Sequence, residues 1–154
     1  MTDTEVAGRT FDLVQEELRE LGSHVVAAAG NPQEPFGLYA FDAAAPESEL
    51  ARAVERCVFD EFFGNSAELL DAEYGPYEES TVFLCVMDQR RHLPAGTVRV
   101  ILPSARGFKS LHDLEGIWAR PLGEILPKIG LELGHDDVYD ITTIAVAADY
   151  RGKA

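Results

Sequence analysis

The residues with the clearest chemical potential lie near the end of the chain, where an apolar strand pattern runs into a short basic turn. Residues 138–146 are rich in β-branched side chains, and Tyr150-Arg151-Gly152-Lys153-Ala154 follows after a short polar step. A strand that leads through such a turn to the start of a helix presents backbone N–H groups and positive charge to a phosphate. The segment therefore predicts a phosphate-binding turn.

This segment resembles motif A of the GNAT superfamily of acyl-CoA-dependent N-acyltransferases. In that motif a hydrophobic strand, often followed by Tyr, leads into Arg/Gln-x-x-Gly-x-Gly/Ala. Arg151 aligns with the first position, Ala154 stands where the motif has its first Gly, and the last motif position lies beyond the chain. The resemblance implies that acetyl-CoA or another acyl-CoA is the co-substrate, with no metal. The residues it implies for the cofactor are Ile144, Ala145, Val146, Arg151, Gly152, Lys153 and Ala154.

The same resemblance suggests two catalytic residues on either side of this strand. Asp140 is the candidate general base, because GNAT enzymes often place an acid near this strand and alternation sets its side chain opposite Ile141. The alternative is an acid at a strand end that faces water or pairs with an Arg. Tyr150 is the candidate hydrogen-bond partner of the leaving thiolate, and its alternative is a packed aromatic ring.

The acceptor site of GNAT enzymes often forms after the second helix, which here corresponds to Glu73, Tyr74 and Tyr77, with Glu78 beside them. The resemblance thus implies that these residues contact a small-molecule amine or amino-acid-like acceptor. The alternative is a loop with solvated acids.

A narrower resemblance is to the acyl-homoserine-lactone synthases, which share the GNAT fold. It rests on Arg52 with Val58-Phe59, on residues 98–103, where Arg99 and Pro103 fit a strand end like Arg-Leu-Leu-Pro, and on residues 140–146. Asp140 stands where that family has Glu, and Thr143 stands where it has Arg. This resemblance adds Arg99 to the expected substrate contacts.

The elements that must position these residues follow from periodicity and turn signals. Helices are expected over residues 10–21, where Gly22 would be the C-terminal stop, from an N-cap at Ser48 to Gly64, and from an Asn65-x-x-Glu68 capping box to about residue 72. Strands are expected over residues 36–41, buried on both faces, and over 81–87, 97–102 and 137–146. Residues 24–35 are expected to form a loop, 88–96 a hairpin connection, and 104–136 an irregular segment with short helices.

This order predicts an α/β (α+β) fold with a GNAT-like mixed, mostly antiparallel sheet flanked by helices and incomplete at the C-terminus. The resemblance implies a helical extension and linker over 1–35, followed by the N-terminal part of a GNAT-like acyltransferase domain over 36–154. The last strand would then leave an unpaired apolar edge. We expect a homodimer, or the missing C-terminal half, to cover it. A catalytically inactive binding or dimerisation module is the alternative function.

Composition limits the function classes. The chain has 154 residues and a formal net charge of −14, which opposes nucleic-acid binding. No apolar run suits a membrane span and no secretory signal precedes the domain, so we expect a cytoplasmic protein. Cys57 and Cys85 lie in apolar segments and are expected to be reduced core thiols. Residues 135–137, His-Asp-Asp, are read as a polar turn rather than a metal site.

The acids that crowd between Asp60 and Glu79 have two interpretations. The first is a solvated helical face. The second is an acidic rim that attracts an amine substrate.

Overall fold

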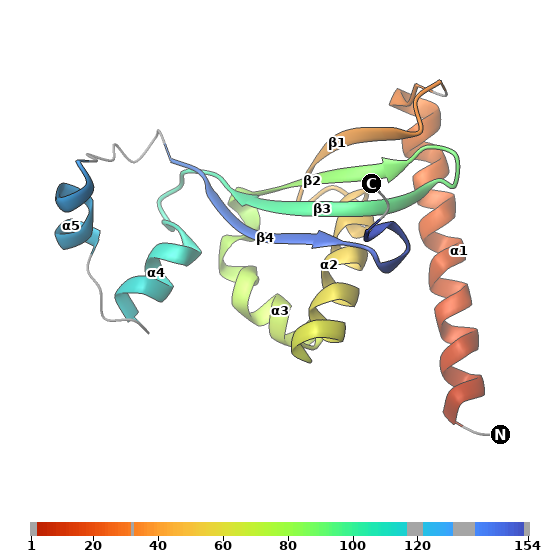
Figure 1. The fold of residues 1–154 in the computed structure, drawn as a ribbon, viewed down its shortest axis with the longest axis horizontal. Coiled ribbons are helices and arrows are strands. Elements are labelled where there is room, and N and C mark those ends of the chain that lie inside the picture. Colours follow the sequence, from red (N-terminus) through yellow and green to blue (C-terminus); the bar gives the residue numbers. More distant parts are fainter. Residues whose placement is uncertain (1–2, 32, 117–121, 131–137, 153–154) are drawn as a thin grey trace.

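The computed structural model describes residues 3–31, 33–116, 122–130 and 138–152, with side chains described from Gln15 onward except at 122 and 123. Its centre is a four-stranded antiparallel sheet in which every strand pairs with its neighbour in sequence, in the order β1-β2-β3-β4 (Figure 1). The strands are β1 (Phe36–Asp42), β2 (Thr81–Asp88), β3 (Leu93–Ile101) and β4 (Asp140–Val146). With its helices the sheet forms an α+β fold, as the sequence predicts.

Helices α2 (Ser48–Phe63) and α3 (Ala67–Tyr74) lie on one side of the sheet, which we call the inner face (Figure 1). The core forms where α2 and α1 (Asp3–Ala29) meet that face. Its buried members are Val25, Phe41, Ala43, Leu50, Ala51, Phe83, Cys85 and Met87, with Leu18, Leu21 and Tyr39 packed against them.

The remaining helical elements connect strands or follow them. A 3-10 segment, Gly75–Ser80, links α3 to β2. Between β3 and β4 lie α4 (Lys109–Gly116), α5 (Leu122–Ile125) and a 3-10 turn, Leu126–Ile129, and another short 3-10 turn, Ala148–Tyr150, follows β4. Helices α4 and α5 lie beyond the end of the sheet opposite α1 (Figure 1).

Helix α1 continues well past the predicted stop. The expectation of a loop from residue 24 was wrong as far as Ala29, because the helix extends through this Ala-rich stretch. Gly22 has a different role from a helix end. A Cβ atom there would lie 2.1 Å from the carbonyl oxygen of His92, so glycine allows α1 to pass closely over the β2–β3 hairpin.

Helices α2 and α3 both begin differently from the prediction. For α2 the predicted capping hydroxyl bonds elsewhere, and for α3 the capping residue is one position later. The Ser48 hydroxyl does not cap α2; it donates to the Ala43 carbonyl at 2.9 Å. The cap of α3 is Ser66, whose hydroxyl accepts from the Leu69 N–H, and the helix then runs to Tyr74. Helix α2 ends at Gly64 as predicted.

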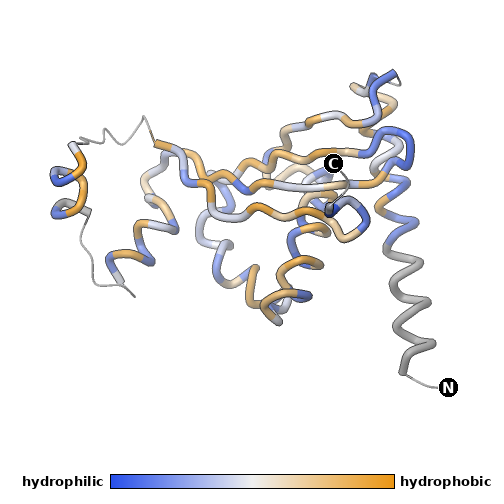
Figure 2. The backbone as a smooth tube through the Cα atoms, viewed as in Figure 1, coloured by the Kyte–Doolittle hydropathy of each residue, from blue (hydrophilic) through white to orange (hydrophobic). Residues whose placement is uncertain are grey.

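The second face of the sheet is apolar and largely open to solvent. Leu38 is 68% exposed and Ile144 is 69% exposed, so the expectation that the first strand is buried on both faces was wrong. The register places one apolar set on this side, which we call the outer face: Leu38, Ala40, Val82, Leu84, Val86, Val98, Val100, Ile141, Ile144 and Val146. Figure 2 shows hydrophobic colouring along the strands.

The β2–β3 connection is tighter than predicted, because β3 already begins at Leu93 and only residues 89–92 turn the chain. His92, at a φ of 56°, adopts a left-handed conformation in this turn. Both cysteines are free thiols. Cys85 is buried as expected, but Cys57 is exposed on α2 and is not a core residue. None of the described helices is long and apolar enough to cross a membrane.

Candidate functional site: a charged pocket between α2, α3 and β3

A pocket of about 440 Å³ opens beside the inner face of the sheet. Its walls come from the loop before α2, from one side of α2, from the end of α3 and the turn after it, and from β3. The residues that line it are Ala43, Ala44, Ala45, Pro46, Ser48, Glu49, Arg52, Arg56, Asp71, Tyr74, Gly75, Glu78 and Arg99.

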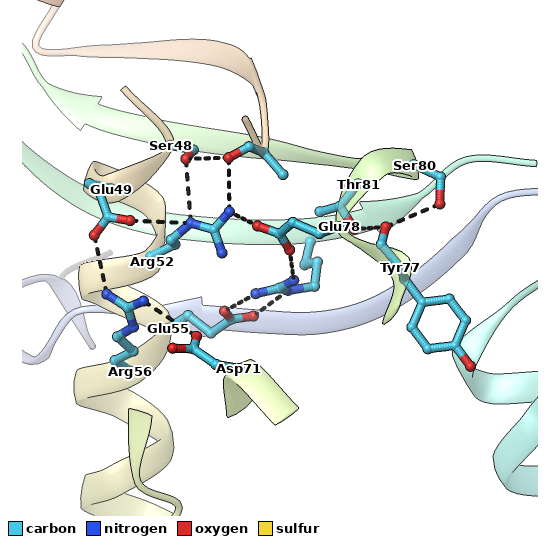
Figure 3. Close-up of polar contacts among 12 residues, drawn as sticks. Ser48, Glu49, Arg52, Glu55, Arg56, Asp71, Tyr77, Glu78, Ser80 and Thr81 are labelled. Atoms are coloured by element: carbon cyan, nitrogen blue, oxygen red, sulfur yellow. Dashed lines mark hydrogen bonds and ion pairs between the residues drawn. The ribbon is translucent and has the colours of Figure 1, made fainter. Parts of the chain in front are cut away.

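Helical spacing brings three of the six charged pocket residues together. Glu49, Arg52 and Arg56 lie three and four residues apart, so their side chains share one side of α2. Arg56 donates to Glu49 at 3.1 Å and to Asp71 of α3 at 3.4 Å, which ties the two helices across the pocket mouth (Figure 3).

Arg99 forms the floor of the pocket. It points to the inner face from the middle of β3 and is 2% exposed. Its Nε and Nη2 atoms donate to the two oxygens of Glu55 at 3.0 and 2.7 Å, and Nη1 donates to Glu78 at 3.4 Å. The rings of Tyr74 and Phe83 lie 4.4 and 4.6 Å from its guanidinium carbon. Carboxylates therefore balance the charge of this buried guanidinium, and aromatic rings pack against its planar group.

Arg52 forms the second buried cation. Its Nη2 atom donates to Glu78 and to the Ala43 carbonyl, the latter at 2.9 Å, while Nε lies 3.3 Å from Glu49. Burial lowers the pKa of Arg52 and the nearby charge of Arg99 adds to this effect. Glu78 thus bridges two arginines.

The pocket floor is connected to the edge strand β4. The Thr143 hydroxyl donates to Glu55 at 2.5 Å, and Thr143 lies opposite Arg99 in the sheet register. The register shifts next to this pair, which leaves Thr142 as an extra residue in β4. Such bulges redirect backbone groups, and they are frequent beside active sites.

The structure brings together three of the five residues that the resemblance implies for the acceptor. Tyr74, Glu78 and Arg99 all line the pocket. Glu73 is exposed and lies 4.0 Å from Lys109. Tyr77 is buried on another side, where it contacts His112 and packs in a cluster with Ile101 and Phe108.

Asp140, the candidate base, is buried at the start of β4. Its two oxygens accept from the backbone N–H and the hydroxyl of Ser110, at 2.9 and 2.6 Å. Because Ser110 lies in the first turn of α4, Asp140 serves as a cap for that helix. It is held against α4 and does not line the pocket.

Tyr150 lies beyond the other end of β4, roughly 20 Å of strand away from Asp140. Its hydroxyl donates to Asp88 at 2.8 Å and its ring meets Phe36 at 6.0 Å. Burial raises the pKa of Tyr150 to about 12, and the hydrogen bond to Asp88 adds to the shift. The structure therefore does not bring Asp140 and Tyr150 into one site.

The predicted phosphate turn is described as far as Gly152, whose φ is 67°. Arg151 donates to both oxygens of Glu61, at 3.0 and 2.8 Å, and to the Val146 carbonyl. This side chain is engaged by the protein, so the backbone of the turn is what remains to meet an anion. Lys153 and Ala154 lie outside the described residues.

The three predicted cofactor residues within β4 face two ways. Ile144 and Val146 point to the outer face, whereas Ala145 is buried against Val54 and Val58 of α2. Residues 135–137, expected to form a polar turn, lie outside the described residues. Within the described ranges, no group of three or more His, Cys, Asp or Glu side chains is arranged to hold a metal ion.

Sequence reasoning missed Glu55 and Arg56 and did not assign a role in the site to Glu49. The available signal was Arg99 itself. An arginine in the middle of an apolar strand, at an inward position, requires a buried carboxylate. The pattern did not reveal which of the many acids supplies it, because that depends on how α2 crosses the sheet.

No family model matches the chain, and no curated protein or solved structure matches it either.

Proposed function

We propose that the protein is a GNAT-like N-acyltransferase that moves an acyl group from acyl-CoA, or from an acyl carrier protein, to an amine. The observation that carries the proposal is the link between the charged pocket and β4. The pocket floor, through Glu55, holds Thr143 of β4 beside the bulge at Thr142. An acceptor in the pocket and a thioester along the edge of β4 would thus both lie near the bulge at Thr142 and Thr143.

The reaction needs few groups. The amine attacks the thioester carbonyl directly, the C–S bond breaks, and the thiolate leaves with a proton, without a covalent enzyme intermediate. The carbonyl oxygen needs a hydrogen-bond donor as charge develops on it. The outer edge of β4, whose backbone is displaced at Thr142, is the proposed source of that donor. Glu49 and Asp71 at the pocket mouth are proposed to take the proton from the ammonium form of the acceptor.

The order of the elements supports the same assignment. Helices α2 and α3 lie between β1 and β2, and β2, β3 and β4 follow as a meander before the turn at Gly152. This matches the first half of the order that the GNAT resemblance implies. The free thiols of Cys57 and Cys85 agree with the proposed location in the cytoplasm.

The first test is thermal unfolding of the chain with acetyl-CoA and with longer acyl-CoAs. A ligand that binds only the folded state adds about 2.7 kcal/mol at 100 times its dissociation constant, so the melting temperature should rise. Gly152→Ala should abolish the shift, because a Cβ at this φ strains the turn proposed to hold the pyrophosphate. Gly130→Ala is the matched control, since Gly130 has a similar φ of 70° in a different turn.

Product formation is the second readout. Incubation with acyl-CoA and a panel of amines should release free thiol and yield an N-acyl product detected by mass spectrometry. Glu55→Gln should lower this rate, because it weakens the connection between the pocket floor and Thr143. Absence of both a thermal shift and a product with every acyl-CoA would contradict the proposal.

The outer face favours a second candidate, a binding or dimerisation module without turnover. This face carries ten aliphatic positions, with Asp42 of β1 as a charged residue on the same side, and it borders β4, which pairs with no further strand among the described residues. A second copy could cover such a face with an identical one. Light scattering across a concentration series tests this directly. A monomer at all concentrations would contradict dimerisation, and N-acyl product from the chain would contradict an inactive module.

A further inference from the structure

Arg52 has one nitrogen atom that the protein does not use. Its hydrogen bonds leave from Nε, toward Ser48 and Glu49, and from Nη2, toward Ala43 and Glu78. Figure 3 shows the remaining nitrogen of the Arg52 guanidinium with no contact drawn to it. Within the part of the chain that the structure describes, Nη1 therefore has no hydrogen-bond partner.

This unused nitrogen belongs to a buried side chain that lines the pocket. Arg52 as a whole is 8% exposed. Its Nη1 atom is nevertheless not sealed inside the protein. Among the described residues, the fully buried side-chain N and O atoms without a hydrogen-bond partner are the hydroxyls of Thr97 and Thr142, so Nη1 of Arg52 is not one of them. Because Arg52 lines the pocket, we take the pocket to be the space from which a ligand reaches the two N–H groups of Nη1.

The chemistry of a guanidinium defines what such a ligand carries. Buried N–H groups of a cation are almost always paired, and a carboxylate is the partner that matches the charge and geometry of arginine. Ala43 and Glu78 already fix the plane of the Arg52 head, so the unused edge is held in one orientation. Pre-organisation of this kind favours a small anionic group over a flexible neutral one.

A cation-binding group lies on the Nε side of the same guanidinium (Figure 3). The Glu49 carboxylate is 3.3 Å from Arg52 Nε, and its side chain is 53% exposed at the pocket mouth. In an α-amino acid the carboxylate and the amino group share one carbon atom. In the binding mode proposed here, the carboxylate lies on Nη1 and the amino group turns toward Glu49 at the pocket mouth.

We propose that the pocket binds a free α-amino acid, with the carboxylate on Nη1 of Arg52 and the amino group toward Glu49. Its side chain occupies the rest of the 440 Å³ volume, which is within the usual range for small-molecule sites. The inference rests on the proposed function in one respect, namely that the bound amino acid is the acyl acceptor. It makes Arg52 a binding residue that discriminates amino acids from simple amines.

The first experiment varies the ligand and leaves the protein unchanged. Isothermal titration calorimetry with the twenty common L-amino acids identifies the best binder, which is then compared with its methyl ester and with its decarboxylated amine. Both analogues keep the side chain and the amino group. Each should bind roughly 10- to 100-fold more weakly, the range for a lost hydrogen bond to a charged group.

The second experiment varies the protein. Arg52→Gln should remove most of the preference for the free acid over its methyl ester, so that the two ligands bind with similar affinity. Arg52→Lys should keep part of the preference, because it keeps the charge but loses the planar edge. Arg91→Gln is the control, since Arg91 lies in the β2–β3 turn, pairs with Asp149 after β4 and does not line the pocket, and it should leave the preference intact. If Arg52→Gln does not fold, the ester comparison on the unchanged protein still decides the question.

The outcomes separate this inference from the proposed function. Equal binding of acid, ester and amine would overturn the inference, and so would failure of all twenty amino acids to bind. Carboxylate-dependent binding without acylation in the presence of acyl-CoA would support the inference and remove the proposed function. Acylation of simple amines alone would retain the proposed function and overturn the inference.

Discussion

Arg99 contacts side chains from four elements of the fold. It bonds to Glu55 of α2 and Glu78 of the 3-10 segment, and it packs against Tyr74 of α3 and Phe83 of β2. Its charge is compensated almost entirely inside the protein. Such a pair contributes little net stability compared with an apolar pair, but removal of one partner is costly because the other charge is left buried.

Glu55→Ala should therefore destabilise the protein by about 3–5 kcal/mol, the range for breaking a buried ion pair. Chemical denaturation measures this change. Glu49→Ala is the matched control on the same helix, and because Glu49 is half-exposed its loss should cost less than about 1 kcal/mol. The double variant Glu55→Leu with Arg99→Met should recover most of the stability. A double variant as unstable as Glu55→Ala would show that packing, rather than unpaired charge, dominates here.

The environment of Asp88 is expected to make the stability of the protein depend on pH. Burial alone would raise the pKa of Asp88, but the N–H of Arg91, the hydroxyl of Tyr150 and the N–H of Arg90 all donate to its carboxylate and lower the pKa below its usual 3.8. A folded-state pKa below the unfolded one adds stability above about pH 4, and this contribution is lost as the pH falls through the folded-state value.

Asp88→Asn should thus destabilise the protein at pH 7 and make little difference at pH 2. Urea midpoints for both proteins across this range provide the measurement. Tyr150→Phe is a useful companion, because it removes one donor to Asp88 and should reproduce part of the effect. A stability difference between wild type and Asp88→Asn that does not change with pH would contradict the assigned cause.

The site is predictable only where its residues stand out in the sequence. Arg99 interrupts an apolar strand, and Tyr74 lies next to a Gly-Pro break, so the sequence alone is enough to single out both residues. The roles of Glu55 and Arg52 are not predictable in this way. They are ordinary charges on an amphipathic helix, and their burial results from the angle at which α2 crosses β3. Asp140 is predicted as a base from the GNAT resemblance of the last strand, which cannot show that α4 begins against it.

At the scale of elements, α1 passes closely over the β2–β3 hairpin at Gly22, where an added Cβ would meet a neighbour at the shortest distance among the described glycines. Ser23 of the same helix hydrogen-bonds to His92 at 2.9 Å, so the contact is polar as well as close. Since a Cβ at position 22 would meet a backbone oxygen, no side-chain rotation can relieve the overlap.

Gly22→Ala should destabilise the protein by about 1–3 kcal/mol, as overpacking does in well-packed interiors. Thermal unfolding measures the loss, and amide hydrogen exchange should show weakened protection in the β2–β3 hairpin. Gly116→Ala in α4 is the control, because nothing lies within 4 Å of its added Cβ, and it should be neutral or slightly stabilising. Equal effects of the two variants would contradict the close-contact explanation.

Strands and helices with a clear period are predictable to within a few residues, as α2, α3, β2 and β4 demonstrate. The errors arise where a residue type has two uses. Gly22 suggests a helix end, yet glycine also permits close packing. Residues 93–96 contain Pro and Gly, which suggest a loop, but Pro94 and Gly96 are paired residues of β3. Local propensity cannot resolve these cases, because the neighbouring element decides them.

At the scale of the whole molecule, the outer face contrasts with the rest of a strongly acidic surface. Four strands about 4.8 Å apart and some 20 Å long give it a projected area of roughly 400 Å², within the range of the largest apolar patches on monomers. Ile144 lies in β4, the border strand, which pairs with no further strand among the described residues.

Ile144→Lys should therefore reduce the fluorescence of the dye ANS bound to the protein and lower its tendency to associate, because a charge opposes both. Leu69→Lys on α3 provides the comparison, since Leu69 is also exposed, at 45%, but lies away from the outer face. A larger effect from Leu69→Lys than from Ile144→Lys would place the associating surface elsewhere.

The strand order also determines the sequence of events by which the pocket can form. Only residues 89–92 separate β2 from β3, whereas residues 43–80 and 102–139 must be looped out before β1 and β4 can join the sheet. Closing a short loop costs less entropy, so the β2–β3 hairpin is expected to form early in folding and β4 to dock late. Because Thr143 of β4 holds Glu55, a folding intermediate without β4 would have a collapsed sheet but an unfinished pocket floor. Completion of folding and completion of the site would then be the same kinetic step.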